Sequence, residues 1–127
     1  MASHIAMDYL EVWNGKFAEL LEDLTVLFGD DPDLLLLRTG FALARAAAKD
    51  SAWRVFRDHV EVPYGAKVLA KDESFFMTFV LGDDTRVLGI VDRVRRAWKD
   101  LSPANRDVIW QYFTLLVQLS ARVTRSP

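Results

Sequence analysis

The most constraining feature of this 127-residue sequence is an apolar segment near its C-terminus, NRDVIWQYFTLLVQLS (residues 105–120). On a helical wheel its large apolar and aromatic side chains cover about 220° of the circumference, whereas a helix lying on a protein surface needs only about 100°. The other positions form one narrow polar strip: Asp107, Gln111, Thr114, Gln118 and Arg122. A helix with so wide an apolar arc has to be covered on two or three sides. We therefore expect it at the centre of a small bundle, ringed by helices over 7–28, 32–49 and 85–100.

One edge of this arc has a second interpretation. Surplus apolar surface marks sites where proteins dock. The edge formed by Trp110 and Val117 is therefore a candidate docking face for a protein partner or a second copy of the chain. The two interpretations are compatible, because one edge can dock while the rest of the arc packs in the core.

Capping residues separate the first two predicted helices. Gly29 ends the first, because glycine tolerates the left-handed backbone just past a helix C-terminus. Asp31 then caps the second, with Pro32 as its first helical residue. The second helix begins with four leucines and continues with small residues: Gly40, Ala42, Ala44, Ala46, Ala47 and Ala48. Such small side chains allow the close approach of a neighbouring helix.

The sequence between residues 52 and 80 predicts several short helices. The first, over 52–60, should end at Val62-Pro63, because the residue before a proline avoids the helical region. Further pieces are expected over 66–69 and, capped by Asp72, over 74–80. Ser102 caps the last helix, with Pro103 at its first position.

No segment alternates as a strand does. The fold expected is all-α, a compact bundle of five or six helices with the C-terminal helix central. One domain should span residues 7–123, with 1–6 a flexible leader or an artificial remnant and 124–127 a frayed tail.

The small net charge of −2 is unevenly distributed. Residues 1–34 hold eight acidic side chains and one basic one, whereas the rest of the chain holds ten acidic and fifteen basic ones. We expect the two parts to pack with complementary charges. The longest strongly apolar stretch free of formal charge, 108–121, is shorter than the roughly twenty residues of a membrane span. We therefore expect a soluble protein without membrane contact.

No catalytic, cofactor or metal motif is found in the sequence. The absence of cysteine excludes disulfides, thiolate zinc sites and thiol nucleophiles. His59 and Glu61 form His-x-Glu, but the zinc deaminase signature also needs two downstream cysteines. Asp30, Asp31 and Asp33 are expected to cap a helix. We predict no enzyme activity, no cofactor and no metal.

A basic group lies in the helix predicted over 85–100. Arg86, Arg93 and Arg96 fall on its outward face with Lys99 nearby, where they could contact phosphates or an acidic partner. The alternative is that these charges form i,i+4 ion pairs, Asp92 with Arg96 and Arg96 with Asp100. A pI of about 5.6 argues against a dedicated nucleic-acid-binding protein.

Three stretches together resemble a known family: FAELLEDLTVLFGDDPDL (17–34), VPYGAKVLAKDESFFM (62–77) and LSPANRDVIWQYFTLLVQLS (101–120). Their order and spacing are similar to those of short helical proteins of large double-stranded DNA viruses of algae and amoebae. Gly29 stands where that family typically has proline, which changes a helix end only. The resemblance implies a viral origin and a non-enzymatic role, and it supplies no site residues.

These observations give two functional expectations. The first is a non-enzymatic viral helical module for protein–protein interaction or self-association, or a virion-associated protein, located in the host cytoplasm or the virion. The alternative is a nucleic-acid-associated accessory protein that uses the basic face of the helix over 85–100.

Overall fold

The computed structural model describes residues 8–29, 31–79 and 88–125, and every regular element among them is helical. The all-α class is confirmed. The elements in chain order are α1 (Tyr9–Phe28), α2 (Pro32–Ala47), α3 (Ser51–Phe56), the π-helical turn η1 (Arg57–Glu61), α4 (Val62–Leu69), α5 (Ser74–Thr78), α6 (Gly89–Ala97), the 3-10 turn η3 (Trp98–Asp100) and α7 (Pro103–Arg125).

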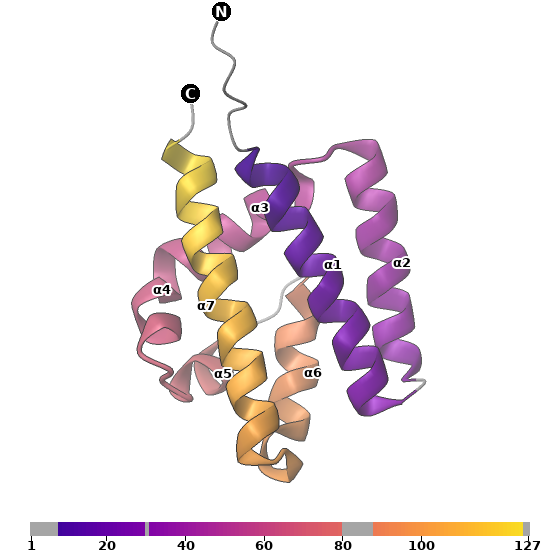
Figure 1. Ribbon diagram of the computed structural model, residues 1–127, viewed down its shortest axis with the longest axis vertical. Helices are drawn as coiled ribbons and strands as arrows, with labels where there is room; N and C mark the ends of the chain where they lie inside the picture. The colour runs from indigo at the N-terminus through magenta and orange to yellow at the C-terminus, as the bar shows by residue number, and fades with distance from the viewer. Residues whose placement is uncertain (1–7, 30, 80–87, 126–127) are drawn as a thin grey trace, which may run out of the picture.

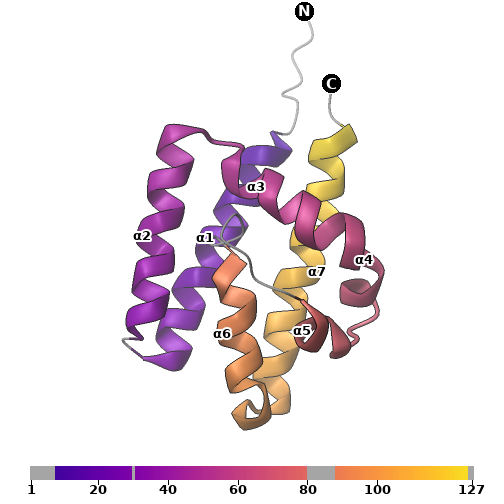
Figure 2. The same cartoon turned by 180° about the vertical axis from the view of Figure 1, so that it is seen from behind.

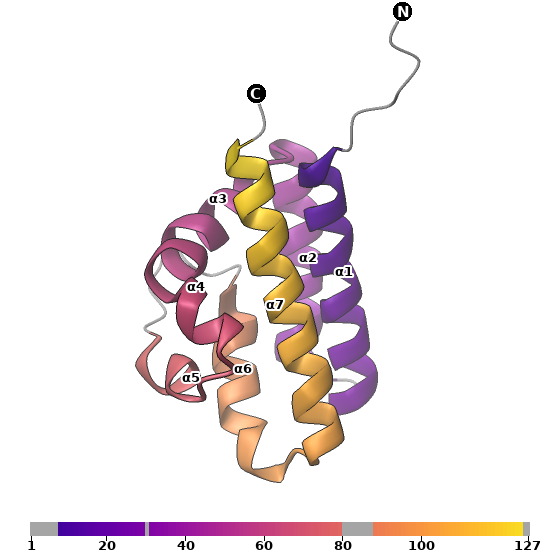
Figure 3. The ribbon, with the colours of Figure 1, turned by 60° about the vertical axis from the view of Figure 1, so that its left-hand side comes forward.

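The helices α1, α2, α6 and α7 run roughly along the long axis of the molecule, and α1 lies between α2 and α7, antiparallel to both (Figure 1). The continuous segment α3–η1–α4 crosses these helices obliquely, on the side of the bundle that faces the viewer in Figure 2. The first turn of α1 and the last turn of α7 lie at the same end of the bundle (Figure 3).

The surroundings of α7 differ from the predicted ring of helices. Its principal neighbours are α1, η1 and α4, whereas α2 packs mainly on α1, α3 and α6. The expected place of α2 beside α7 was wrong, because α1 lies between them. The expected covering of the wide apolar arc is nevertheless present, since Ile109, Phe113 and Leu116 are at most 1% exposed.

The core contains two groups of packed aromatic rings. In the first, Trp13 stacks on Phe17 at a ring-centroid distance of 5.1 Å, and Phe17 meets Phe41 at 4.8 Å, which joins α1 to α2. The second joins α5, η3 and α7 and comprises Phe75, Phe76, Trp98, Trp110 and Phe113. Aromatic pairs at these distances add to the free energy gained from burying their area.

Three of the predicted helix ends, those at Gly29, Asp31 and Ser102, are confirmed. Gly29 has a φ of 71°, which favours glycine at the end of α1. Asp31 accepts a hydrogen bond of 2.8 Å from the backbone N–H of Asp33 at the start of α2. Ser102 accepts one of 3.1 Å from the backbone N–H of Asn105 at the start of α7. These bonds satisfy backbone donors that have no partner within a helix.

Pro63 does not break the helix as expected. Val62 keeps a helical backbone, with φ −66° and ψ −53°, and the chain stays helical from Ser51 to Leu69. The turn before the proline is π-helical, because the backbone N–H of Val62 donates to the carbonyl of Arg57, five residues back. A π-helical turn is one of the local rearrangements by which a helix accommodates an irregularity.

Other predicted boundaries differ from the structure or lie outside the residues that it describes. α7 includes Thr124 and Arg125, which we placed in a frayed tail. The leader at 1–6, the first residues of the helix predicted over 85–100, and residues 126–127 lie outside the described residues. Across the described ranges, none of the helices combines the length and the apolar character that crossing a membrane requires.

Candidate docking surfaces

The predicted docking edge of α7 faces the protein interior. Trp110 and Val117 are each 5% exposed. Trp110 packs against Phe76 at 5.1 Å, and Val117 faces Gly65 of α4, where an added Cβ would lie 3.6 Å from its Cγ1. The docking face predicted at Trp110 and Val117 is therefore wrong, because α4 and α5 cover it. The open edge of the arc is the opposite one, where Val108 is 44% exposed.

Arg93 of the predicted basic face forms an ion pair across the bundle. Its Nε lies 2.6 Å from Oδ2 of Asp31, and both side chains are largely buried. The guanidinium also lies over the ring of Phe28 at 4.2 Å. The hydrogen bond from Arg93 is the main cause that lowers the pKa of the Asp31 carboxyl below its ordinary value. Arg93 thus holds the start of α2 against α6.

The rest of the basic face is largely neutralised within the described chain. Arg96 lies 3.2 Å from Asp33 and 3.2 Å from Asp92, so the predicted Asp92–Arg96 pair is confirmed and Asp33 takes the place predicted for Asp100. Arg95 also pairs with Asp92, and Lys99 is exposed. Arg86 lies outside the described residues. The expected charge complementarity between the N-terminal part and the rest is confirmed by the pairs of Arg93 and Arg96.

A buried polar network connects α3, η1 and α7. The indole Nε1 of Trp53 donates to Oγ of Ser120 at 2.9 Å, and Ser120 donates to Oε1 of Glu61 at 2.6 Å. Ser120 is 0% exposed, so its hydroxyl is closed to a substrate. We did not predict this network, although Ser120 falls near the middle of the apolar arc of its helix, where a polar side chain signals an internal partner. Within the described ranges, no three His, Asp or Glu side chains are grouped so that they could hold a metal ion.

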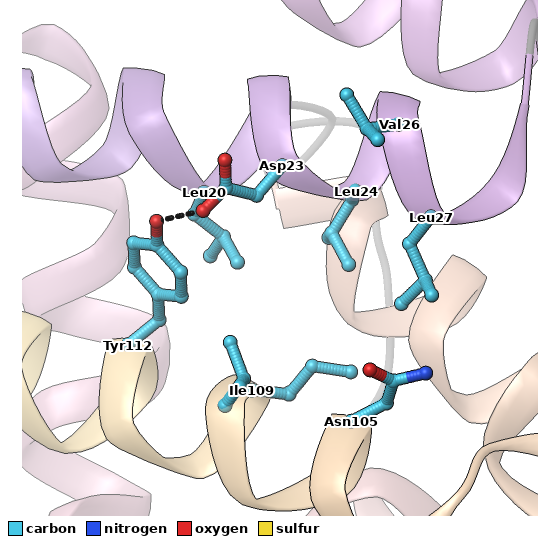
Figure 4. Close-up of a pocket in the computed structure, with 9 residues that line it drawn as sticks. Leu20, Asp23, Leu24, Val26, Leu27, Asn105, Ile109 and Tyr112 are labelled. Carbon is cyan, nitrogen blue, oxygen red and sulfur yellow. Dashed lines mark hydrogen bonds between the residues drawn. The ribbon is translucent and has the colours of Figure 1, made fainter.

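A shallow groove lies between the second half of α1 and the first half of α7 (Figure 4). It has a volume of about 290 Å³ and its wall is mostly apolar. At one end the hydroxyl of Tyr112 donates to Asp23 (Figure 4). Burial, followed by the hydrogen bond to Asp23, raises the pKa of Tyr112 well above its ordinary range. The lining residues are Leu20, Asp23, Leu24, Val26, Leu27, Asn105, Val108, Ile109 and Tyr112.

An uncovered apolar surface lies on the outward side of α2, and we call it the α2 outer face. Its three leucines, Leu35, Leu36 and Leu43, are 44%, 71% and 67% exposed. Only Leu34 and Phe41 of this helix are fully buried. The α2 outer face consists of Leu35, Leu36, Thr39, Gly40, Ala42, Leu43, Ala46 and Ala47, all exposed and none charged.

The position of α2 explains why this face is open. The helix lies at the edge of the bundle and packs on α1 and α6 through its inner side (Figures 1 and 2). Arg38 and Arg45 border the face on the side of α1, where a hollow of about 390 Å³ separates the two helices. Arg45 bonds Glu11 at 2.7 Å and so fastens the far end of α2 to α1. The small residues predicted to admit a neighbouring helix therefore point mostly away from the described chain.

Comparison of the chain with protein-family models, with curated proteins and with solved structures finds no significant match. The resemblance to viral helical proteins stays a prediction. The function has to be argued from the surfaces described above.

Proposed function

We propose that this protein is a helical protein–protein interaction module that acts by docking, without catalysis, through the α2 outer face. The observation that carries the proposal is the exposure of Leu36 and Leu43 in a helix that has no charged residue on the same side. Single exposed apolar residues are common on monomeric proteins, but a contiguous apolar patch marks an interaction site.

The α2 outer face fits docking better than the groove between α1 and α7. The groove is shallow, and the Asp23 carboxylate lies at one end of it. The α2 outer face extends along a helix of 16 residues, on the order of 24 Å, and carries no charge that docking would have to desolvate. Its small residues also let a partner approach the helix backbone closely.

The alternative role in nucleic-acid binding has less support. Phosphate binding needs basic side chains that are free to replace the counterions of the nucleic acid. Arg93 and Arg96 are instead held by Asp31 and Asp33, and Arg93 is only 18% exposed. These arginines serve to attach α6 to α2 in the proposal.

The proposal keeps the cellular setting implied by the sequence resemblance. A viral docking module in the host cytoplasm or the virion would act by binding a protein partner. The α2 outer face makes no demand on the chemistry of that partner beyond an apolar, closely fitting surface.

Photo-crosslinking tests the proposal directly. A photoreactive benzoylphenylalanine placed at Thr39, in the middle of the α2 outer face, should form covalent adducts in the purified protein or in an extract of the expressing cells. The same residue placed at Gln111, which is exposed on the polar strip of α7, is the matched control and should form few adducts. Equal, low yields at both positions in both samples would contradict the proposal.

A further inference from the structure

We propose that the groove between α1 and α7 binds a short cationic amphipathic helix of another protein. This groove is separate from the α2 outer face, so the inference goes beyond the proposed function and does not depend on it. Three observations carry it: exposed apolar side chains in the groove, carboxylates along α1 with no competing base, and a shape that suits a helix better than a small molecule.

The groove offers apolar side chains that the fold leaves in contact with solvent. Val26, Leu27 and Val108 are 81%, 38% and 44% exposed, and all three line the groove. Leu24 and Leu27 point from α1 towards α7 (Figure 4). Since Val26 and Val108 come from the two facing helices, a ligand lying between them would remove apolar surface of both helices from water.

The charged side chains of α1 beside the groove are of one sign. Neither residues 17–28 of α1 nor residues 107–121 of α7 include a lysine, arginine or histidine. The same segment of α1 carries three carboxylates: Glu19, Glu22 and Asp23. Asp23 lines the groove, and Glu19 lies one turn before it on the same side of the helix. A cationic ligand would therefore be attracted to this side of the groove, where an apolar ligand would have to desolvate a carboxylate.

The two bases nearest to these segments in the sequence have partners of their own. The Nζ of Lys16 lies 3.1 Å from Oε2 of Glu19, so it neutralises one of the three carboxylates of α1. The guanidinium of Arg106 donates to the carbonyl of Trp98 at 2.6 Å and does not line the groove. An excess of negative charge therefore remains on α1 beside the groove.

The hydroxyl of Tyr112 shows that the three carboxylates act on the same end of the groove. Burial and the hydrogen bond to Asp23 are the main causes that raise the pKa of Tyr112, and the charges of Glu19 and Glu22 add to them. A field that disfavours a tyrosinate at this position favours a lysine or arginine side chain there.

The shape of the groove selects a helix as its ligand. Its volume of about 290 Å³ is shallow and lies just below the range of about 300–1,000 Å³ for sites that enclose a small molecule. An extended peptide would need partners for its backbone N–H and C=O groups, and the groove has few polar side chains, namely Asp23, Asn105 and Tyr112. A helix satisfies its own backbone, so only its side chains have to fit.

The length of the groove sets what the partner presents. The stretch of α1 from Leu20 to Leu27 spans about 10 Å, or two helical turns. The partner helix would place two or three apolar side chains at helical spacing in the groove, with lysine or arginine directed at Glu19 and Asp23. Such a contact is smaller than the patch of about 800 Å² per partner of stable complexes, so we expect a weak complex that salt weakens further.

Fluorescence anisotropy of a labelled peptide with the full chain tests the inference. The probe is a helical peptide of about 14 residues that has leucine at every third and fourth position and lysine on its other side. Its match has glutamate in place of each lysine. We expect the lysine peptide to bind at low salt with a Kd on the order of 100 µM, and the glutamate peptide to bind at least about tenfold more weakly.

A first pair of variants tests the role of the carboxylates. Glu19→Gln/Asp23→Asn keeps an acceptor for the Tyr112 hydroxyl and should weaken binding of the lysine peptide at least about fivefold. The control Asp58→Asn/Asp100→Asn removes the same number of charges at two exposed positions that do not line the groove. It should leave the Kd within about twofold of the wild-type value.

A second pair tests the apolar wall. Val26→Ala/Val108→Ala should weaken binding of the lysine peptide at least about threefold, because it removes apolar contact area from both helices. Both valines are exposed, so the variant should fold, which circular dichroism verifies. The control Leu36→Ala/Leu43→Ala shortens two exposed side chains of the α2 outer face and should leave the Kd unchanged.

Three results would overturn the inference. The first is no binding of the lysine peptide up to about 1 mM, and the second is equal binding of the lysine and glutamate peptides. The third is a loss of binding in either control that matches the loss in the corresponding groove variant. If the loss occurs in Leu36→Ala/Leu43→Ala, the α2 outer face is the site that binds the peptide, so the proposed function stands and the inference about the groove falls.

Discussion

The helices α2 and α7 are both rich in apolar residues, yet they meet different surroundings. α7 buries Ile109, Phe113 and Leu116 almost completely between α1 on one side and α4 with η1 on the other. α2 buries Leu34 and Phe41 and leaves the three leucines of its outer face in contact with solvent. Apolar side chains therefore stabilise the fold in α7, whereas those on the outer side of α2 stay exposed and form the surface that we propose for docking.

The difference teaches that the position of a helix decides what its apolar residues do. α7 lies between α1, α4 and η1, so its wide apolar arc is buried against them. α2 lies at the edge of the bundle, where only one side is needed to attach it through Leu34, Phe41 and the Asp31–Arg93 pair. The outer side is not needed to attach the helix, and it is the surface that we propose for docking.

The largest expected effect compares one leucine in each helix. Leu116→Ala should lower the free energy of unfolding by about 2–5 kcal/mol, because Leu116 is fully buried and its removal leaves a cavity. Leu36→Ala should change it by less than about 0.5 kcal/mol at concentrations where the protein is monomeric, because Leu36 is 71% exposed. Urea unfolding of both variants measures the difference. Equal losses would show that α2 is as enclosed as α7.

The next effect concerns the polar network that fixes α7. Ser120→Ala should cost about 1–3 kcal/mol, because it leaves the buried indole N–H of Trp53 without its acceptor and Glu61 without its donor. Thermal and urea unfolding give the value. Gln118→Ala, on the exposed strip of the same helix, is the control and should be close to neutral. If Ser120→Ala leaves the free energy of unfolding unchanged, the network does not help to hold α7 in place.

A smaller effect of opposite sign is expected on α2. Gly40→Ala should stabilise the monomer by about 0.5–1 kcal/mol, because alanine favours a helix over glycine and an added Cβ meets no atom within 4 Å. Differential scanning calorimetry in dilute solution measures it. Destabilisation would mean that some part of the chain covers the α2 outer face.

The smallest effect is a change in the dependence of stability on pH. Hydrogen bonds hold the pKa values of Asp31, Asp58 and Asp72 below their ordinary value of 3.8. A lowered pKa in the folded state means that this stabilisation is complete above about pH 4 and is lost as the pH falls through the folded pKa. Asp31→Asn keeps a helix cap but removes one of the three contributions. Its urea midpoint should therefore fall less steeply below about pH 4 than that of the wild type, and an unchanged slope would contradict the role of the Asp31–Arg93 pair.

The sequence predicted the helices and their ends better than their neighbours. The caps at Asp31 and Ser102 depend on local chemistry, so they were readable from a few residues. The neighbours of α7 depend on how the whole chain folds back, which a helical wheel does not contain. For this reason the arc was expected to be covered, but the covering of Trp110 and Val117 by α5 and α4 was missed.

The sequence indicated the residues of the candidate docking surface but not that they are exposed. The run of small residues after the leucines of α2 indicated the close approach of a helix, but we expected that helix within the bundle. Whether Gly40 and Ala46 point inward or outward depends on which side of α2 meets α1, and this is a property of the packed structure. The partners of Arg93 and Arg96 were likewise visible only as an imbalance of charge between two parts of the chain.

The most direct test of the account is the reactivity of a single thiol on the α2 outer face. In the Leu36→Cys variant of this cysteine-free chain, the account predicts fast labelling of the purified protein in dilute solution, because position 36 is exposed. Leu116→Cys should stay protected throughout, and Gln118→Cys should stay reactive throughout. If Leu36→Cys is as protected as Leu116→Cys even in the most dilute sample, the α2 outer face is not the open surface described here.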